Sequence, residues 1–291
     1  MHYSSTTLSA GHTFLESPRW HKGDLYVSDF FTKRVLKFPR GDNDFEVVLE
    51  LPSTPSGLGF LPSGDLLVVS MEDRSILRAH DGEISLHADL SKYSPFLLND
   101  MFVDGSGRCY VGGLGHSAGD ESDFGPQPLI FVQSDGSVEA LDADLNFPNG
   151  IVGSKSQLFI AETYAGSVRV LSLDQAGRPH SPRVWAQFGG RPLGYDIESA
   201  HEQLEVEPDG LAVGKDGTLW VADAKGHGVA RVREGGEVVD FVETGPLSTF
   251  AAVESADGDR LFLCCSPSNR TVDWSALTSS ELRVASLSSD R

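Results

Sequence analysis

The sequence predicts an all-β protein, a six-bladed β-propeller that forms a single domain over residues 1–291. Three observations lead to this fold class. A unit of about 40 to 50 residues, the length typical of a propeller blade, recurs along the chain. The 31 Gly and 15 Pro are scattered over the whole length and indicate many turns. Helical periodicity is almost absent, because only residues 91–98 and 196–206 are compatible with a short helix or a capping loop.

Each copy of the recurring unit contains a β-hairpin, with an apolar strand, a polar turn and a second strand. Six copies are visible, at residues 17–30, 56–71, 99–113, 149–163, 209–223 and 251–265. A third strand follows five of them, at residues 34–38, 75–78, 129–132, 167–171 and 228–232. Radial blades of about four strands leave a central channel, and a functional site is expected at its mouth. We expect residues 6–14, which precede the first hairpin, to pair with the last blade and close the ring.

Composition and charge exclude several classes of partner. The formal net charge of -19 makes nucleic acid and an anionic membrane surface poor partners. No stretch approaches the ~20 apolar residues of a membrane span, and the N-terminal residues lack the features of a secretory signal. The three Cys give no disulfide framework. We therefore expect a cytoplasmic protein, a monomer or a small homo-oligomer, whose partner is a small molecule.

Polar residues stand at the start of the first strand in four of the hairpins, where a blade needs small or apolar packing. They are Glu16, Asn99-Asp100, Asn149-Gly150 and Asp209-Gly210. Equivalent positions of radial repeats point at the same axis, so these side chains are expected to meet at one end of the channel. Carboxylate and amide oxygens suit a hard or borderline divalent cation. The alternative is that each Asn-Gly or Asp-Gly pair is only a turn.

Four sequence strings at these positions resemble one known family. ESPRW (16–20), LND (98–100), FPNG (147–150) and EPDGLAVGKDGTLWVAD (207–223) are similar to the SMP-30, gluconolactonase and luciferin-regenerating enzyme family. The resemblance runs over nearly the whole chain and in the family's order. It implies a propeller with one divalent metal ion, usually calcium or zinc, with manganese or magnesium as alternatives. It also implies hydrolysis of a lactone ring.

The resemblance assigns roles residue by residue. It implies that Glu16, Asn149 and Asp209 are the metal ligands and that Asp209 also serves as the general base. Asn99 is then expected to lie close to the metal or substrate and to orient the carbonyl or the developing oxyanion. For Asp100, supporting the loop or Asn99 is the stronger interpretation.

One position departs from the family. Its sugar-lactone hydrolases commonly carry Arg two residues ahead of the Asn of the Asn-Asp pair, and here that residue is Leu97. A less polar substrate pocket is therefore expected, and its candidate residues are Ser94, Phe96, Leu97, Phe124, Phe147 and Tyr164. Glu162 ends a strand and is a candidate for a hydrogen bond in the channel.

Other kinds of catalytic site find little support. None of the nine His forms a metal-binding pair motif. His116 and His227 can line the channel mouth as substrate-binding residues, with exposure at a loop tip as the alternative. No G-x-S-x-G motif indicates a Ser nucleophile. Cys109 and Cys264 lie within strand patterns and are expected to belong to the core.

The leading functional hypothesis is a metal-dependent lactone hydrolase, similar to gluconolactonases. Two alternatives stay open. One keeps the metal but changes the bond to an aryl ester or an organophosphate. The other is a calcium-binding propeller without catalysis.

Overall fold

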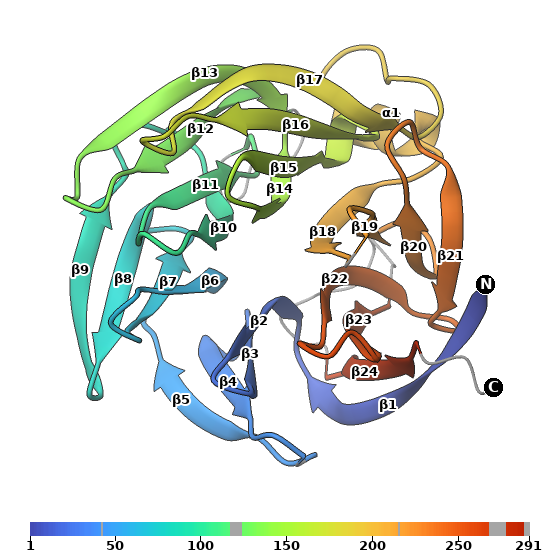
Figure 1. Cartoon of the computed structure of the whole chain (residues 1–291), viewed down its shortest axis with the longest axis horizontal. Helices are drawn as coiled ribbons and strands as arrows, with labels where there is room; N and C mark the ends of the chain where they lie inside the picture. The colour runs from blue at the N-terminus through green and yellow to red at the C-terminus, as the bar shows by residue number, and fades with distance from the viewer. Residues whose placement is uncertain (42, 117–123, 215, 268–277, 288–291) are drawn as a thin grey trace. The chain divides into compact units, whose positions relative to one another are not determined.

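The computed structural model describes residues 1–41, 43–116, 124–214, 216–267 and 278–287 (Figure 1). The described residues are mostly β-strands, with one α-helix, α1 (Ile197–Gln203), and one 3-10 turn, η1 (Thr163–Ala165). The predicted all-β, propeller-like fold is confirmed. Within the described ranges, no helix is long and apolar enough to cross a membrane. The chain divides into a first unit, Met1–Thr54 with Asp209–Arg291, and a second unit, Pro55–Pro208.

The second unit consists of three four-stranded antiparallel sheets whose strands follow chain order. The strands are β6 (Pro55–Phe60), β7 (Leu66–Ser70), β8 (Ser75–His80) and β9 (Glu83–Asp89); β10 (Leu98–Val103), β11 (Cys109–Gly113), β12 (Pro126–Val132) and β13 (Val138–Asn146); and β14 (Pro148–Gly153), β15 (Gln157–Glu162), β16 (Ser167–Leu173) and β17 (Pro179–Gln187). The first strand of the middle sheet, β10, lies beside both β6 and β14 (Figure 1). The starts of three first strands are therefore brought together.

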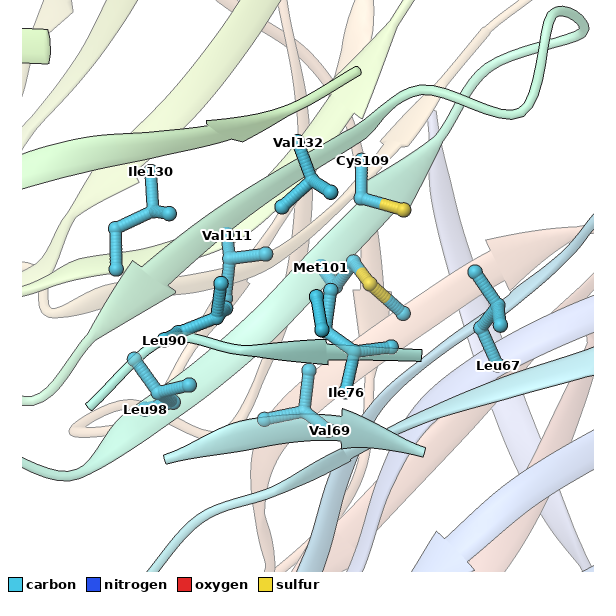
Figure 2. Packing of buried hydrophobic residues seen from close by; sticks show 11 residues of the cluster. Leu67, Val69, Ile76, Leu90, Leu98, Met101, Cys109, Val111, Ile130 and Val132 are labelled. Carbon is cyan, nitrogen blue, oxygen red and sulfur yellow. The ribbon is translucent and has the colours of Figure 1, made fainter. Parts of the chain in front are cut away.

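Apolar side chains from neighbouring sheets fill the space between them. Figure 2 shows Leu67 and Val69 of β7 packed with Met101 of β10 and Cys109 of β11, all fully buried. β6 approaches β10 closely because Gly57 has no side chain. A Cβ there would lie 2.4 Å from the backbone nitrogen of Met101.

The first unit contains one four-stranded and one eight-stranded sheet. The four-stranded sheet consists of β2 (Leu15–His21), β3 (Asp24–Asp29), β4 (Arg34–Phe38) and β5 (Glu46–Glu50). The other sheet has the order β18-β19-β20-β21-β1-β24-β23-β22. Its strands are β18 (Pro208–Val213), β19 (Leu219–Asp223), β20 (Gly228–Val232), β21 (Val238–Glu243), β1 (His2–His12), β24 (Ser280–Ser286), β23 (Arg260–Ser266) and β22 (Ser248–Glu254).

The N-terminal strand explains why the sheets number five. β1 pairs antiparallel with β24 from Ser5 to His12, so the predicted pairing of residues 6–14 with the last blade is confirmed for residues 6–12. Its first residues, His2 to Ser4, also pair parallel with β21. One strand thus joins two runs of four strands into a single sheet. The prediction of six separate blades is wrong in this respect, although all six predicted hairpins form.

Of the two segments expected to form a short helix or a capping loop, one contains a helix. The segment 196–206 contains α1, whose N-cap Asp196 accepts a hydrogen bond from the backbone N–H of Ser199 at 2.6 Å. The segment 91–98 forms turns instead. The hydroxyl of Ser94 accepts from the N–H of Phe96 at 3.1 Å, and Pro95 has no N–H to continue a helix.

Candidate functional site

The first strand of each hairpin has one register position that carries the candidate residues. In five hairpins, a backbone N–H at the end of the first strand donates to a carbonyl across the turn, as Leu61 does to Asp65 at 2.9 Å. The residues five positions before these N–H groups are Ser56, Asn99, Asn149, Asp209 and Phe250. Glu16 stands at the same distance from His21, the last residue of β2. Five of the six positions are polar, and all six residues are buried.

A local irregularity separates this position from the rest of the strand. The ladder register shifts between Glu16 and Arg19 in β2, and between Pro148 and Ile151 in β14. Corresponding shifts occur in β6, β10 and β22. β-bulges bend a strand, redirect a side chain and are common beside active sites. The same irregularity therefore accompanies this position in polar strands and in β22, which has Phe250 there.

In the second unit the polar side chains form one directional chain of hydrogen bonds. The Thr163 hydroxyl donates to the carbonyl of Pro208 at 2.8 Å and accepts from Nδ2 of Asn149 at 3.2 Å. Oδ1 of Asn149 accepts from Nδ2 of Asn99 at 2.8 Å. Oδ1 of Asn99 accepts from the Ser56 hydroxyl at 3.0 Å.

The backbone carbonyl of Pro208, at one end of this chain of hydrogen bonds, fixes the direction of every bond in it. A carbonyl oxygen only accepts, so the hydroxyl of Thr163 must donate its single proton to Pro208 and can only accept from Asn149. The amide of Asn149 must then present its oxygen to Asn99, and the amide of Asn99 must present its nitrogen to Asn149. Both amide orientations follow from one backbone carbonyl.

Asp100 supports the neighbouring strand, whereas support of its own loop or of Asn99 was expected. Its carboxylate accepts from the backbone N–H of Ile151 at 3.1 Å, and its side chain is buried. Because Ile151 lies two residues after Asn149, this bond holds β14 directly behind the bulge. Asp100 therefore acts on the site through the backbone.

In the first unit, two carboxylates of the set lie near the same buried thiol. Burial raises the pKa of the Cys264 thiol well above its ordinary value, and the charges of Glu16 and Asp209 raise that pKa further. The charge of Arg19 lowers the pKa of the same thiol. Cys264 is fully buried, while Glu16 and Asp209 are 9% and 5% exposed. Two nearly buried carboxylates and one guanidinium therefore share one region.

A glycine explains how Asp209 comes close to Cys264. A Cβ on Gly210 would lie 2.5 Å from Cα of Ala251, so only glycine allows β18 to lie this close to β22. Ala251 is paired across the ladder with Cys264. The Asp-Gly sequence is thus a requirement of strand packing, and it is not a hairpin turn.

The structure places Leu97 and His116 beside each other. The N–H of Leu97 donates to the backbone carbonyl of His116 at 3.2 Å, and its carbonyl accepts from Leu114 at 3.0 Å. His116 is buried, so exposure at a loop tip is wrong for this residue. Residues 117–123 of the same Gly-rich loop lie outside the described ranges. His227 is exposed.

An aromatic cluster adjoins Asn149 in the second unit. The ring of Tyr164 lies 5.1 Å from Phe147 and 4.7 Å from Phe124, between ring centroids. Tyr164 and Phe124 also pack with Ile197 of α1. Phe147 has a positive φ of 53°, a backbone conformation that residues other than glycine rarely adopt. Phe124, Phe147 and Tyr164, three of the predicted pocket residues, therefore form one group.

Glu162 has a structural role that differs from the one expected. Its fully buried carboxylate accepts from Nε and Nη2 of Arg169 at 2.9 and 3.0 Å, and from the backbone N–H of Asn146 at 3.1 Å. These bonds fix the start of the turn that leads to Asn149. Glu162 was expected to form a hydrogen bond in the channel. Its bonds to Arg169 and to the backbone of Asn146 instead make it a support for the backbone before Asn149.

Cys109, the other cysteine that was predicted to belong to the core, is buried. Cys109 lies among apolar side chains in Figure 2, and burial raises the pKa of its thiol to about 12. It is therefore a core residue. In the described part of the chain, no group of three or more His, Cys, Asp or Glu side chains is arranged to hold a metal ion. In the six-position set, the amides of Asn99 and Asn149 and the hydroxyl of Ser56 are the oxygen groups available besides the two carboxylates.

Sequence reasoning missed Thr163 and Phe250. Thr163 follows the acidic end of β15, where a turn residue is unremarkable by sequence. Phe250 is apolar and so gives no polar signal in the sequence, but it lies five residues before Ser255, whose N–H donates across the hairpin turn.

The fold is that of a propeller-like protein, and its candidate site residues stand at the starts of the first strands. The model of the SMP-30/gluconolactonase/LRE-like region matches residues 14–266, and the chain belongs to this family. A 6-deoxy-6-sulfogluconolactonase from Pseudomonas putida is 24% identical over 275 residues, which cover 89% of this chain and 87% of that protein.

Solved structures show the same fold at low identity. Regucalcin from Agrobacterium tumefaciens, described as a calcium-binding protein, has a TM-score of 0.78 at 19% identity, with 99% of this chain and 95% of that chain covered. A gluconolactonase from Xanthomonas campestris has a TM-score of 0.73 at 22% identity, with 97% and 89% covered. A luciferin-regenerating enzyme has a TM-score of 0.77 at 18% identity, with 96% and 93% covered.

Proposed function

We propose that this protein is a hydrolase that opens a lactone ring with the help of one divalent cation, calcium or zinc. Glu16, Asn149 and Asp209 are the proposed ligands, as the family resemblance implies. Membership of the family and the lactonase relatives support the reaction class. The observation that carries the proposal is that Glu16, Asn149 and Asp209 are buried and occupy the same register position in the first strands of their hairpins.

The residues present fit such a cation. Burying two like charges near each other is costly unless a positive charge accompanies them. Arg19 supplies one positive charge in this region, and a divalent ion supplies two more. Two carboxylates and an amide oxygen form the oxygen-rich donor set that calcium prefers, and zinc also accepts carboxylate oxygen. The hydrogen-bond chain leaves the amide oxygen of Asn149 with a second lone pair for a ligand.

A bound cation of this kind polarises a carbonyl and lowers the pKa of water. The protein's own residues perform the other steps. Asp209 takes a proton as water adds to the lactone carbonyl carbon. The bond from this carbon to the ring oxygen then breaks, and the ring oxygen receives a proton, which gives a hydroxycarboxylic acid. The second N–H of Asn99, whose first N–H is used by Asn149, donates to the carbonyl oxygen as its negative charge develops.

The proposal is tested with metal-stripped protein that is refilled with single metals. Hydrolysis of a panel of γ- and δ-lactones is measured alongside an aryl ester and a phosphotriester. We expect lactone hydrolysis that depends on calcium or zinc and exceeds hydrolysis of the other esters. Aryl ester or phosphotriester turnover above that of every lactone contradicts the proposal. So does stoichiometric calcium binding without hydrolysis of any ester.

A further inference from the structure

Four phenylalanines of the first unit gather where β2 and β22 begin. The ring centroid of Phe14 lies 4.7 Å from that of Phe250, in an edge-to-face arrangement, and 5.2 Å from that of Phe30. Phe31 lies 6.3 Å from Phe14 and 6.5 Å from Phe30. We call this group the phenylalanine cluster. Edge-to-face pairs are the favoured geometry for aromatic rings.

The backbone holds the phenylalanine cluster in place. The buried carboxylate of Asp29 accepts from the N–H groups of Thr13 and Phe14 at 3.1 and 3.0 Å, and also from the hydroxyl of Thr13. The N–H of Phe30 donates to the carbonyl of Phe14 at 3.0 Å. The rings therefore stand on a rigid support, as a binding surface requires.

The cluster adjoins both carboxylates of the proposed site. Phe14 lies two residues before Glu16. Phe250 occupies the register position that is polar in every other first strand. A Cβ on Gly210, the neighbour of Asp209, would lie 2.9 Å from the carbonyl oxygen of Phe250. An apolar side chain thus stands where the other first strands have a polar group, and its backbone lies against that of Gly210, the neighbour of Asp209.

Three of the four rings are only partly covered by protein, whereas Phe250 is buried like the adjacent core. Phe31 is 37% exposed, and Phe14 and Phe30 are half-buried. Leu15 and Leu25, which belong to the adjacent core, are each 1% exposed. Ligand sites are lined mainly by apolar and aromatic side chains around a few polar groups. The phenylalanine cluster beside Glu16 and Asp209 has this composition.

We propose that the phenylalanine cluster binds the hydrocarbon substituent, aryl or alkyl, of the substrate whose ester bond is opened beside Asp209. This inference rests on the proposed lactone hydrolysis and narrows its substrate class. A polyhydroxylated sugar ring would lose water at these rings without gaining hydrogen bonds. A phenyl or alkyl group gains contact area there.

The experiment compares ligands that share one ring and differ in one substituent. Hydrolysis is measured for γ-butyrolactone and its γ-phenyl derivative. Binding of the corresponding lactams, 2-pyrrolidinone and 5-phenyl-2-pyrrolidinone, is measured by calorimetry. For the wild type we expect the phenyl group to raise both kcat/KM and affinity tenfold or more. Phe250→Ser, which introduces the residue that β6 has at this position, is expected to reduce both ratios about tenfold.

Two further variants keep the result interpretable. Phe250→Leu retains an apolar side chain and is expected to keep most of the phenyl preference. Phe45→Ser removes an exposed phenylalanine of the same unit that packs on Phe38, outside the cluster, and is expected to leave both ratios unchanged. If the phenyl lactam binds tightly but neither lactone is hydrolysed, the proposed function fails and the subsite stands. If the wild type shows no preference for the phenyl lactam, the subsite is overturned, whether or not the lactones are hydrolysed.

Discussion

Nδ2 of Asn149 donates a hydrogen bond to the hydroxyl of Thr163 at 3.2 Å, and this hydroxyl donates in turn to the carbonyl of Pro208. Pro208 is the residue that precedes Asp209 in the chain. One threonine therefore fixes the amide orientation of a proposed ligand and restrains the backbone that leads to another. This relationship makes Thr163 a positioning residue.

Thr163→Val tests this role because valine has almost the same shape but no hydroxyl. The variant leaves two buried polar groups without their partner, at a cost of about 1–3 kcal/mol in unfolding free energy. It also frees the Asn149 amide to rotate. We expect kcat/KM for a lactone to fall by on the order of tenfold or more, mainly through kcat. Steady-state kinetics and denaturant unfolding measure the two effects.

Two control variants separate positioning from stability. Thr163→Ser keeps the hydroxyl and is expected to restore activity. Thr218→Val removes a buried hydroxyl in the β18–β19 hairpin, which bonds to Asp216 and Arg231, and is expected to lower stability without lowering kcat. Equal losses of activity in the two valine variants, at equal stability, contradict a positioning role for Thr163.

Removal of both carboxylates tests the proposed metal ligands. Glu16→Ala/Asp209→Ala is expected to contain no stoichiometric metal by elemental analysis after equilibration with calcium or zinc. The matched control is Glu46→Ala/Glu139→Ala, which removes two exposed carboxylates that pair with Lys37 and Arg178 and changes the charge equally. Metal retained at one ion per chain in the Glu16/Asp209 variant places the site elsewhere.

Metal binding is also expected to stabilise the fold, because the ligands come together only in the folded chain. Stabilisation follows RT ln(1 + [L]/Kd) and reaches about 2.7 kcal/mol at a hundredfold excess of metal over Kd. Thermal melts across calcium, zinc and manganese titrations measure it. Melting temperatures that do not change for the wild type argue against a tight preformed site.

The cluster of Asp65, Arg78 and His80 predicts a pH-dependent contribution to stability. A hydrogen bond from Nδ1 of His80 to the Asp65 carboxylate raises the pKa of His80 above its ordinary value. Because the folded pKa exceeds the unfolded one, this stabilisation is complete below the unfolded pKa and is lost as pH rises through the folded pKa. NMR titration is expected to show a lowered His80 pKa in Asp65→Asn. The pKa of His21, which burial lowers, serves as the internal reference.

The hairpins and the polar register position were predictable because both depend on local patterns. Turn residues between short apolar strands define the hairpins, and Glu16, Asn99, Asn149 and Asp209 interrupt the pattern at one repeated point. The eight-stranded sheet was not predictable in this way. The contact that joins its halves is a backbone ladder between His2–Ser4 and Phe241–Glu243, and such long-range pairing leaves no mark on side-chain periodicity.

The surroundings of Glu162 and His116 could not be predicted from the sequence, for a different reason. Glu162 looks like a site residue by position, and only its bonds to Arg169 and Asn146 reveal a backbone support. His116 looks like a loop tip in a Gly-rich segment, yet it is buried. In both cases the sequence identifies the chemical group correctly, but its surroundings come from chain segments that no local pattern specifies.

Leu97 carries the last prediction, which concerns sugar lactones. Its backbone is held on both sides by His116 and Leu114, so the residue has a fixed place two positions before Asn99. The related sugar lactonases commonly have an arginine here, which can donate to substrate hydroxyls. A hydroxyl that is buried against leucine loses water without gaining a partner, at a cost of about 1–3 kcal/mol. An alkyl or aryl group in the same place gains about 0.8 kcal/mol per buried CH₂.

Both effects favour a less hydroxylated lactone, and we expect its kcat/KM to exceed that of glucono-δ-lactone by about tenfold or more, since 1.4 kcal/mol corresponds to one decade. Leu97→Arg is expected to narrow this gap. Leu193→Arg, which places the same charge at an 84% exposed leucine of the same unit, is expected to leave it unchanged. A pH-indicator assay of both lactones at fixed metal, corrected for spontaneous opening, measures the ratio. A wild-type preference for glucono-δ-lactone contradicts the prediction and directs attention to Arg19, whose charge acts on the Cys264 thiol as those of Glu16 and Asp209 do, as the group that recognises sugar hydroxyls.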